Sequence, residues 1–112
     1  MTTPTDLDRL RRESPQCLGV AWFTGAPLRL ASASGEPVGD AWPSWNTVAR
    51  LASALLREGP IASPEVLCQL PQVLLLVAER ASGVVAVAVA LTPAGPGVAL
   101  VQARMAASQV NP

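Results

Sequence analysis

The apolar residues in the first third of the chain form two short runs separated by a turn. The runs cover 18–24 and 28–32, and the Gly25–Pro27 tripeptide between them favours a turn, so the pattern predicts a β-hairpin. The first run is apolar on both faces, which is typical of a central strand. The second contains Arg29 and Ser32 and fits a strand nearer the edge of a sheet.

Three more strands are predicted in the second half of the chain, at 64–70, 72–80 and 83–91. The last two are apolar on both faces and are therefore expected to be central. Along 83–91, small and large residues alternate, so one face of this strand is small and the other large. The small face carries Ala86, Ala88 and Ala90, and the large face carries Val85, Val87, Val89 and Leu91.

Short helices are predicted near both ends of the chain. The first helix is predicted at 5–14. Thr5 can cap it, Asp8 occupies the capping-box position, and Pro15 stops it. The last helix covers about 97–110, and one stripe of it carries Val98, Val101 and Met105.

The longest helix is predicted at 42–58, before the Gly59-Pro60 stop. At 100° per residue, one apolar arc faces a core and consists of Val48, Leu51, Ala52 and Leu55. A second arc widens it and consists of Trp45, Ala49, Ser53 and Leu56. Either the helix is sunk deep in the core, or the second arc packs against another subunit. We favour the second interpretation because Ala49 and Ser53 are small and allow another helix to approach closely.

The element order is therefore α-β-β-α-β-β-β-α. Tight turns between consecutive strands imply an antiparallel sheet, so we expect an α+β fold in which helices flank a five-stranded antiparallel sheet. A chain of 112 residues corresponds to one domain, here 1–112, with short flexible ends at about 1–5 and 110–112.

The composition is apolar and electrically balanced. Half of the residues are hydrophobic, 14% are charged, and eight Arg balance eight acidic residues. Without a basic patch, binding to nucleic acid is not expected. The longest uncharged stretch, 81–103, is broken by Pro and Gly and predicts no membrane insertion. We expect a cytoplasmic protein in which Cys17 and Cys68 are not joined by a disulfide.

The residue inventory argues against catalysis. The chain has no His and no Lys, so it lacks an imidazole base, a Schiff-base amine and a phosphate-binding Lys loop. The acidic residues are scattered, so neither a metal nor a cofactor is expected. Trp22 is expected in the core. Trp42 and Trp45 either pack on the sheet or contact a partner, and Arg50 and Arg57 are either solvated or partner contacts.

The element order and three local motifs resemble the Roadblock (dynein light chain) domain family, whose fold is profilin-like. The motifs are the hairpin that begins at 19–22, the apolar strand 84–91, and Gly97 followed by apolar residues at the start of the last helix. Pro96 departs from the family pattern.

The resemblance implies a non-catalytic adaptor that forms a homodimer or a heterodimer, and we expect the homodimer, with paired central helices and joined third strands. Mapped onto this sequence, the interface consists of Trp45, Ala49, Ser53, Leu56, Val66 and Cys68. Bacterial members regulate Ras-like small GTPases in cell polarity and motility, either directly or by binding a sister Roadblock protein, so these are the partners implied. The alternative is a PAS- or GAF-like sensory domain, which would need a polar-lined cavity for a small ligand.

Overall fold

The computed structural model describes residues 7–14, 16–25, 28–35, 44–54, 65–69, 72–80, 83–91 and 95–110. Its elements follow the predicted order α-β-β-α-β-β-β-α. They are α1 (Leu7–Glu13), β1 (Cys17–Thr24), β2 (Arg29–Gly35), α2 (Trp45–Ser53), β3 (Glu65–Gln69), β4 (Val73–Arg80), β5 (Gly83–Ala90) and α3 (Pro96–Gln109). The predicted Thr5 cap and the flexible ends lie mostly outside the described residues.

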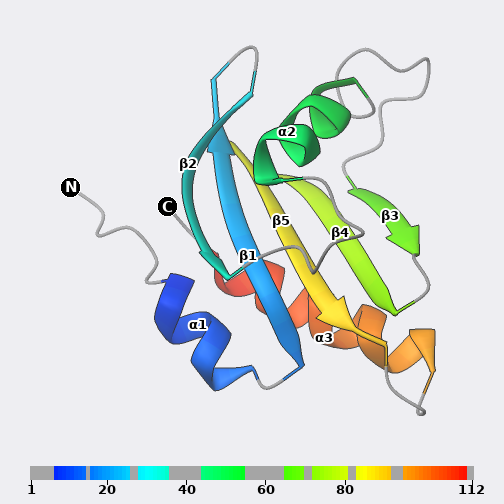
Figure 1. Cartoon of the computed structure of the whole chain (residues 1–112). Helices are drawn as coiled ribbons and strands as arrows, with labels where there is room; N and C mark the ends of the chain where they lie inside the picture. The colour runs from blue at the N-terminus through cyan, green and yellow to red at the C-terminus, as the bar shows by residue number, and fades with distance from the viewer. Residues whose placement is uncertain are drawn as a thin grey trace.

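The five strands form one sheet in the order β2-β1-β5-β4-β3, and every neighbouring pair is antiparallel (Figure 1). The strands that are apolar on both faces, β1, β4 and β5, occupy the three inner positions, as predicted. The edge strand β2 continues to Gly35, beyond the predicted end at Ser32. The extension forms because Ser34 and Gly35 pair with the start of β1 and contact both α1 and α2.

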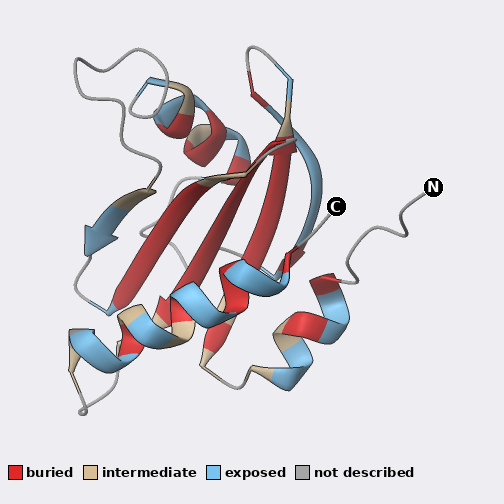
Figure 2. Ribbon diagram, turned by 180° about the vertical axis from the view of Figure 1, so that it is seen from behind, coloured by how far each residue is buried: buried red, intermediate tan, exposed pale blue. Residues whose placement is uncertain are grey.

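The helices form two layers, one on each face of the sheet. α1 and α3 cover the face seen in front in Figure 2, and α2 covers the opposite face. The predicted alternation in β5 is confirmed. Its large residues Val85, Val87 and Val89 face α1 and α3, and its small residues Ala86 and Ala88 face α2.

Packing on each face matches large side chains to small ones. On the α3 side, the large valines of β5 meet a helix whose buried residues are mostly alanines: Ala99, Ala103, Ala106 and Ala107. On the α2 side, the alanines of β5 lie in one cluster with Phe23 and Trp45, whose rings meet edge to face at a centroid distance of 6.4 Å. This interdigitation allows both layers to approach the sheet closely.

The rotation of α2 differs from the prediction. Trp45 and Ala49, which the pattern assigns to a subunit seam, are buried within the chain, whereas Leu51, which the pattern assigns to the core, is 47% exposed. The cause is the anchoring of Trp45. Its ring packs against Phe23, and its indole Nε1 donates a hydrogen bond of 3.0 Å to the carbonyl oxygen of Gly35.

Candidate functional site

An apolar groove separates α2 from the edge strand β3. Its volume is about 50 Å³, and its lining consists of Val48, Leu51, Ala52, Val66, Cys68, Leu75 and Val77. Leu51 and Cys68 are exposed, while Val66 is half-buried. Because no lining residue is Asp, Glu, Lys or Arg, the groove suits an apolar protein surface.

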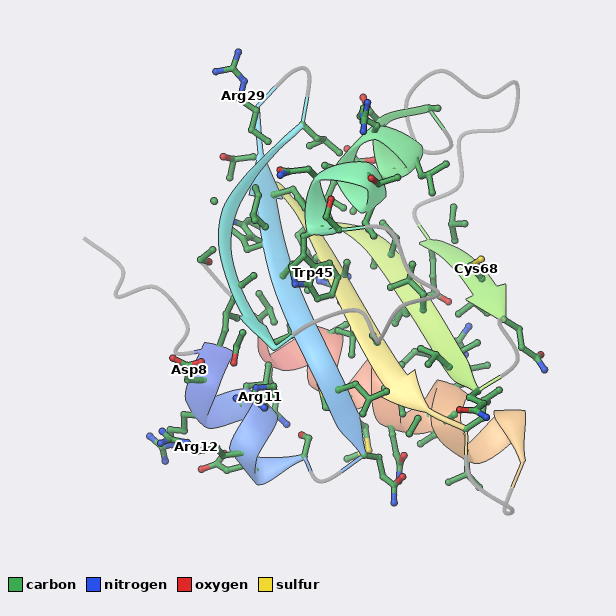
Figure 3. All side chains as sticks on the ribbon, viewed as in Figure 1. Asp8, Arg11, Arg12, Arg29, Trp45 and Cys68 are labelled. Carbon is green, nitrogen blue, oxygen red and sulfur yellow. The ribbon has the colours of Figure 1, made fainter. Side chains whose placement is uncertain are left out.

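The structure places the predicted interface residues in three different environments. Val66 and Cys68 lie together in the groove, and Figure 3 shows Cys68 on β3. Ser53 is half-buried and Arg50 is exposed on α2. Trp45 and Ala49 are already covered by this chain's own sheet, so they can give a partner little area. The remaining predicted contacts, Trp42, Leu56 and Arg57, lie outside the described residues.

Leu51 lines the groove, although the helical pattern of the sequence predicts that it faces the core. The apolar arc of this helix is wide enough to fit several rotations about its axis, and helical periodicity alone does not choose between them. The choice depends on Trp45 reaching Gly35, a contact between residues ten positions apart. Gly35 has a φ of 76°, a conformation that favours glycine.

A buried serine near the end of β2 holds α1 against the sheet. Ser34 is only 3% exposed, and its hydroxyl donates to Asp8 Oδ1 at 2.5 Å while accepting from Arg11 Nε at 2.7 Å. Figure 3 shows Asp8 and Arg11 on α1. Since each of the three groups has a partner, this network accounts for the buried hydroxyl as a structural link between α1 and the sheet.

The two cysteines are free and differ in exposure. Cys17 is buried at the start of β1 and its Sγ lies 3.5 Å from the carbonyl oxygen of Gly19. Burial raises the pKa of the Cys17 thiol above its usual value, and the effect is partly offset by backbone hydrogen bonding at Gly19 and by the Arg11 charge. Cys17 is therefore protonated and unreactive at neutral pH.

The alkaline stability of the protein is expected to report on Cys17. A raised pKa in the folded state means that its stabilising contribution is complete below the unfolded pKa, roughly 8.5, and is lost above it. The chain has no Lys, His or Tyr, so few other groups titrate in this range. Urea unfolding of a Cys68→Ser variant should show stability falling from about pH 8 to pH 10. The fall should be smaller in Cys17→Ala/Cys68→Ser, and an equal fall in both would contradict the assignment.

A second hollow lies on the opposite face of the sheet, between the end of α1, the start of β1, and α3. Its volume is about 210 Å³, and its lining is mixed, with Glu13 and Gln102 beside Cys17 and Met105. Pockets for small-molecule ligands usually measure about 300–1,000 Å³. The hollow is therefore smaller than a sensory domain's ligand cavity is expected to be.

The described part of the chain offers neither a metal site nor a membrane-spanning helix. There, no three His, Cys, Asp or Glu side chains come together as a metal site. No helix in the described segments is both long and apolar enough to cross a membrane.

The sheet order β2-β1-β5-β4-β3, with α1 and α3 on one face and α2 on the other, defines a fold of the Roadblock/LC7 class. The chain is similar in structure to a crystallised Roadblock/LC7 domain from Streptomyces avermitilis, with a TM-score of 0.61 and 21% sequence identity over 95% of each chain. Neither the sequence models of protein families nor the curated proteins give a match. The predicted fold is confirmed by this likeness.

Proposed function

We propose that this chain is a non-catalytic adaptor that forms a homodimer through the groove between α2 and β3. The observation that carries the proposal is the exposed Leu51 beside Val66 and Cys68, with no charged residue in the groove. β3 is also an edge strand of the sheet, and edge strands are the positions at which a sheet can pair with a second strand.

Pairing of β3 with its copy would bring the two grooves together. A two-fold axis normal to the sheet makes the strands antiparallel and keeps both α2 helices on the same face. The two Leu51 side chains then lie near the axis and cover each other's grooves. The contact is self-complementary, as an isologous interface must be.

The adaptor role is supported by the fold and by what the chain lacks. With no His or Lys in the sequence, the common nucleophilic and phosphate-binding arrangements are absent. The resemblance to Roadblock domains favours a cytoplasmic protein that regulates a Ras-like small GTPase. It would act on the GTPase directly or through a sister Roadblock protein, in cell polarity or motility.

Replacing Leu51 with glutamate is expected to convert the dimer to a monomer, because the change places a charge in the apolar seam. Light scattering after gel filtration at micromolar concentration should give twice 11.6 kDa for the wild type and 11.6 kDa for the variant. Leu30→Glu, on the far edge strand β2, is the matched control and should stay dimeric. A monomeric wild type would refute the proposed dimer.

The GTPase role is tested by rate measurements. Ras-like GTPases of the source organism are assayed for GTP hydrolysis with the wild-type protein, with Leu51→Glu, and with a sister Roadblock protein added. A change in rate with the wild type alone supports direct regulation, and a change that requires the sister protein supports indirect regulation. No change in rate and no binding to either protein would overturn this role.

A further inference from the structure

The last helix, α3, exposes its large side chains and buries its small ones. Val98, Val101 and Met105 are all exposed, Val101 and Met105 by 57% and 59%. The residues that face the sheet are mainly alanines, and buried and exposed residues alternate along the helix in Figure 2. Single exposed hydrophobic residues are ordinary, but a continuous apolar stripe on a soluble domain usually marks an interaction site.

The stripe follows the helical repeat. Its members are three and four residues apart, so they lie one above another on the outer side of α3. Seven residues of helix rise about 10 Å, which is the length of two turns. This is the pattern of apolar anchors through which one amphipathic helix packs along another.

At its Met105 end, the stripe reaches the hollow of about 210 Å³. Met105 and Ala106 form part of its wall, together with Cys17 and Val89 of the sheet. These side chains give the hollow a largely apolar interior that is continuous with the stripe. The hollow has room for one long side chain and is small for a cofactor.

One buried hydrogen-bond acceptor in the wall of the hollow lacks a donor among the described residues. Gln102 Oε1 is buried and has no hydrogen-bond partner among the described residues. Leaving a buried acceptor unsatisfied is unfavourable, so a donor is expected to fill this position, from water or from a bound group. Glu13 adds a carboxylate whose ion pair with Arg9 is solvent-exposed, and such pairs are weak.

Arginine and lysine match this lining. Each has an apolar stem that can lie against Met105 and Ala106 and a cationic head that only donates hydrogen bonds. The head could satisfy Gln102 and pair with Glu13. A carboxylate or a wholly apolar side chain would leave the Gln102 oxygen without a donor.

We propose that the outer face of α3 binds an amphipathic helix of a second protein. The apolar residues of that helix lie on Val98, Val101 and Met105, and one Arg or Lys side chain enters the hollow beside Glu13 and Gln102. The surface lies on the opposite face of the sheet from α2, so it is separate from the proposed dimer contact. The proposal gives the proposed adaptor a binding surface but does not require that the protein is a dimer.

A second copy of α3 fits this surface poorly. Arg104 is the only cationic residue of α3, and it donates two hydrogen bonds to Glu65 Oε1 of β3, at 2.7 and 3.1 Å. This pair has one hydrogen bond more than Arg9–Glu13, and its carboxylate side chain is less exposed, at 30% against 57%. Packing of α3 against its own copy would therefore cover the stripe but leave the hollow without a cation. For this reason the occupant is assigned to a different protein.

The test uses the full chain and a displayed library of amphipathic helical peptides with randomised apolar and polar positions. We expect selected peptides to share apolar residues spaced i, i+3 or i+4, and i+7, with Arg or Lys at one fixed offset. Replacing that cation by a neutral analogue, citrulline for Arg or acetyl-lysine for Lys, should weaken binding by about tenfold in fluorescence anisotropy. A library that yields no such motif overturns the proposal.

Variants of the chain separate this surface from the dimer contact. Val101→Glu should weaken the selected peptide at least about tenfold by placing a charge on the stripe. Gln102→Leu should weaken the cationic peptide without harming the fold, because leucine favours helix and removes the unsatisfied oxygen. Leu51→Glu should leave peptide binding unchanged even where it breaks the dimer. Thermal unfolding of each variant confirms that the fold persists.

Two results would count against the proposal. If Val101→Glu binds the selected peptides as tightly as the wild type does, the stripe is not the docking surface. If the wild type forms tetramers at micromolar concentration and Val101→Glu reduces them to dimers, the occupant is a second copy of this chain rather than a partner helix.

Discussion

Replacing Phe23 with alanine is expected to lower the free energy of unfolding by about 3–5 kcal/mol, a large share of the roughly 5–15 kcal/mol that stabilises a typical domain. Phe23 is fully buried in β1 and contacts the edge of Trp45, so its removal leaves a cavity under α2. Urea unfolding followed by tryptophan fluorescence measures the loss. The variant should also release α2 from the sheet more readily than α3.

Leu30→Ala is the matched control for Phe23→Ala. Leu30 pairs with Phe23 across the β1–β2 ladder but lies on the exposed edge strand. Its replacement should cost less than about 1 kcal/mol, since Leu30 is 37% exposed and belongs to neither buried cluster. Equal losses for the two variants would contradict the packing of α2 on β1.

Replacing Ala103 with leucine is the second substitution with a large expected effect, a loss of about 1–3 kcal/mol. Ala103 is fully buried where α3 lies against the large face of β5, and nothing in this contact leaves room for three more carbon atoms. The longer side chain must push α3 away from the sheet. Equilibrium unfolding in urea gives the change in free energy.

Val101→Leu is the control on the same helix, two residues away. Because Val101 faces solvent, this change should alter stability by no more than about 0.5 kcal/mol. A fully stable Ala103→Leu variant would mean that α3 sits more loosely on the sheet than the structure indicates. A strongly destabilised Val101→Leu variant would mean that the stripe contributes to folding as well as to binding.

The order of the elements could be predicted from the sequence because each strand is short, apolar and bounded by turn residues. The alternation of Val and Ala in β5 even predicts which residues share a face, since strand periodicity needs no knowledge of the rest of the chain. The inner positions of β1, β4 and β5 follow from the same local pattern. Local information was enough for these features.

The orientation of the helices depends on contacts between distant residues. Leu51 is exposed because Trp45 turns α2 toward Gly35, and no periodicity within the helix contains that contact. Val98, Val101 and Met105 form a stripe that is visible in the sequence, but its position away from the sheet is not. Alanines fill the other side of α3 because the valines of β5 already occupy the space between helix and sheet.

The candidate sites were predicted only in part. Val66 and Cys68 were selected through the family resemblance and do line the groove, while their proposed contact with a second copy remains a prediction. The hollow beside α3 brings together Glu13, Cys17 and Gln102, which are separated by up to 89 positions in the sequence. No local motif marks such a group, and the Gln102 oxygen, which has no partner among the described residues, is recognised only when all three elements are packed.

The separation of the helices into two layers has a consequence for avidity. If two copies join through β3 about an axis normal to the sheet, both α3 helices lie on the same face of the joined sheet, and the α2 pair lies on the opposite face. A partner with two suitable helices could then engage both at once, the second at a high effective concentration set by its linker. Such bivalent binding can exceed the affinity of one site by about 10²–10⁴-fold, so a weak individual contact would still hold a divalent partner firmly.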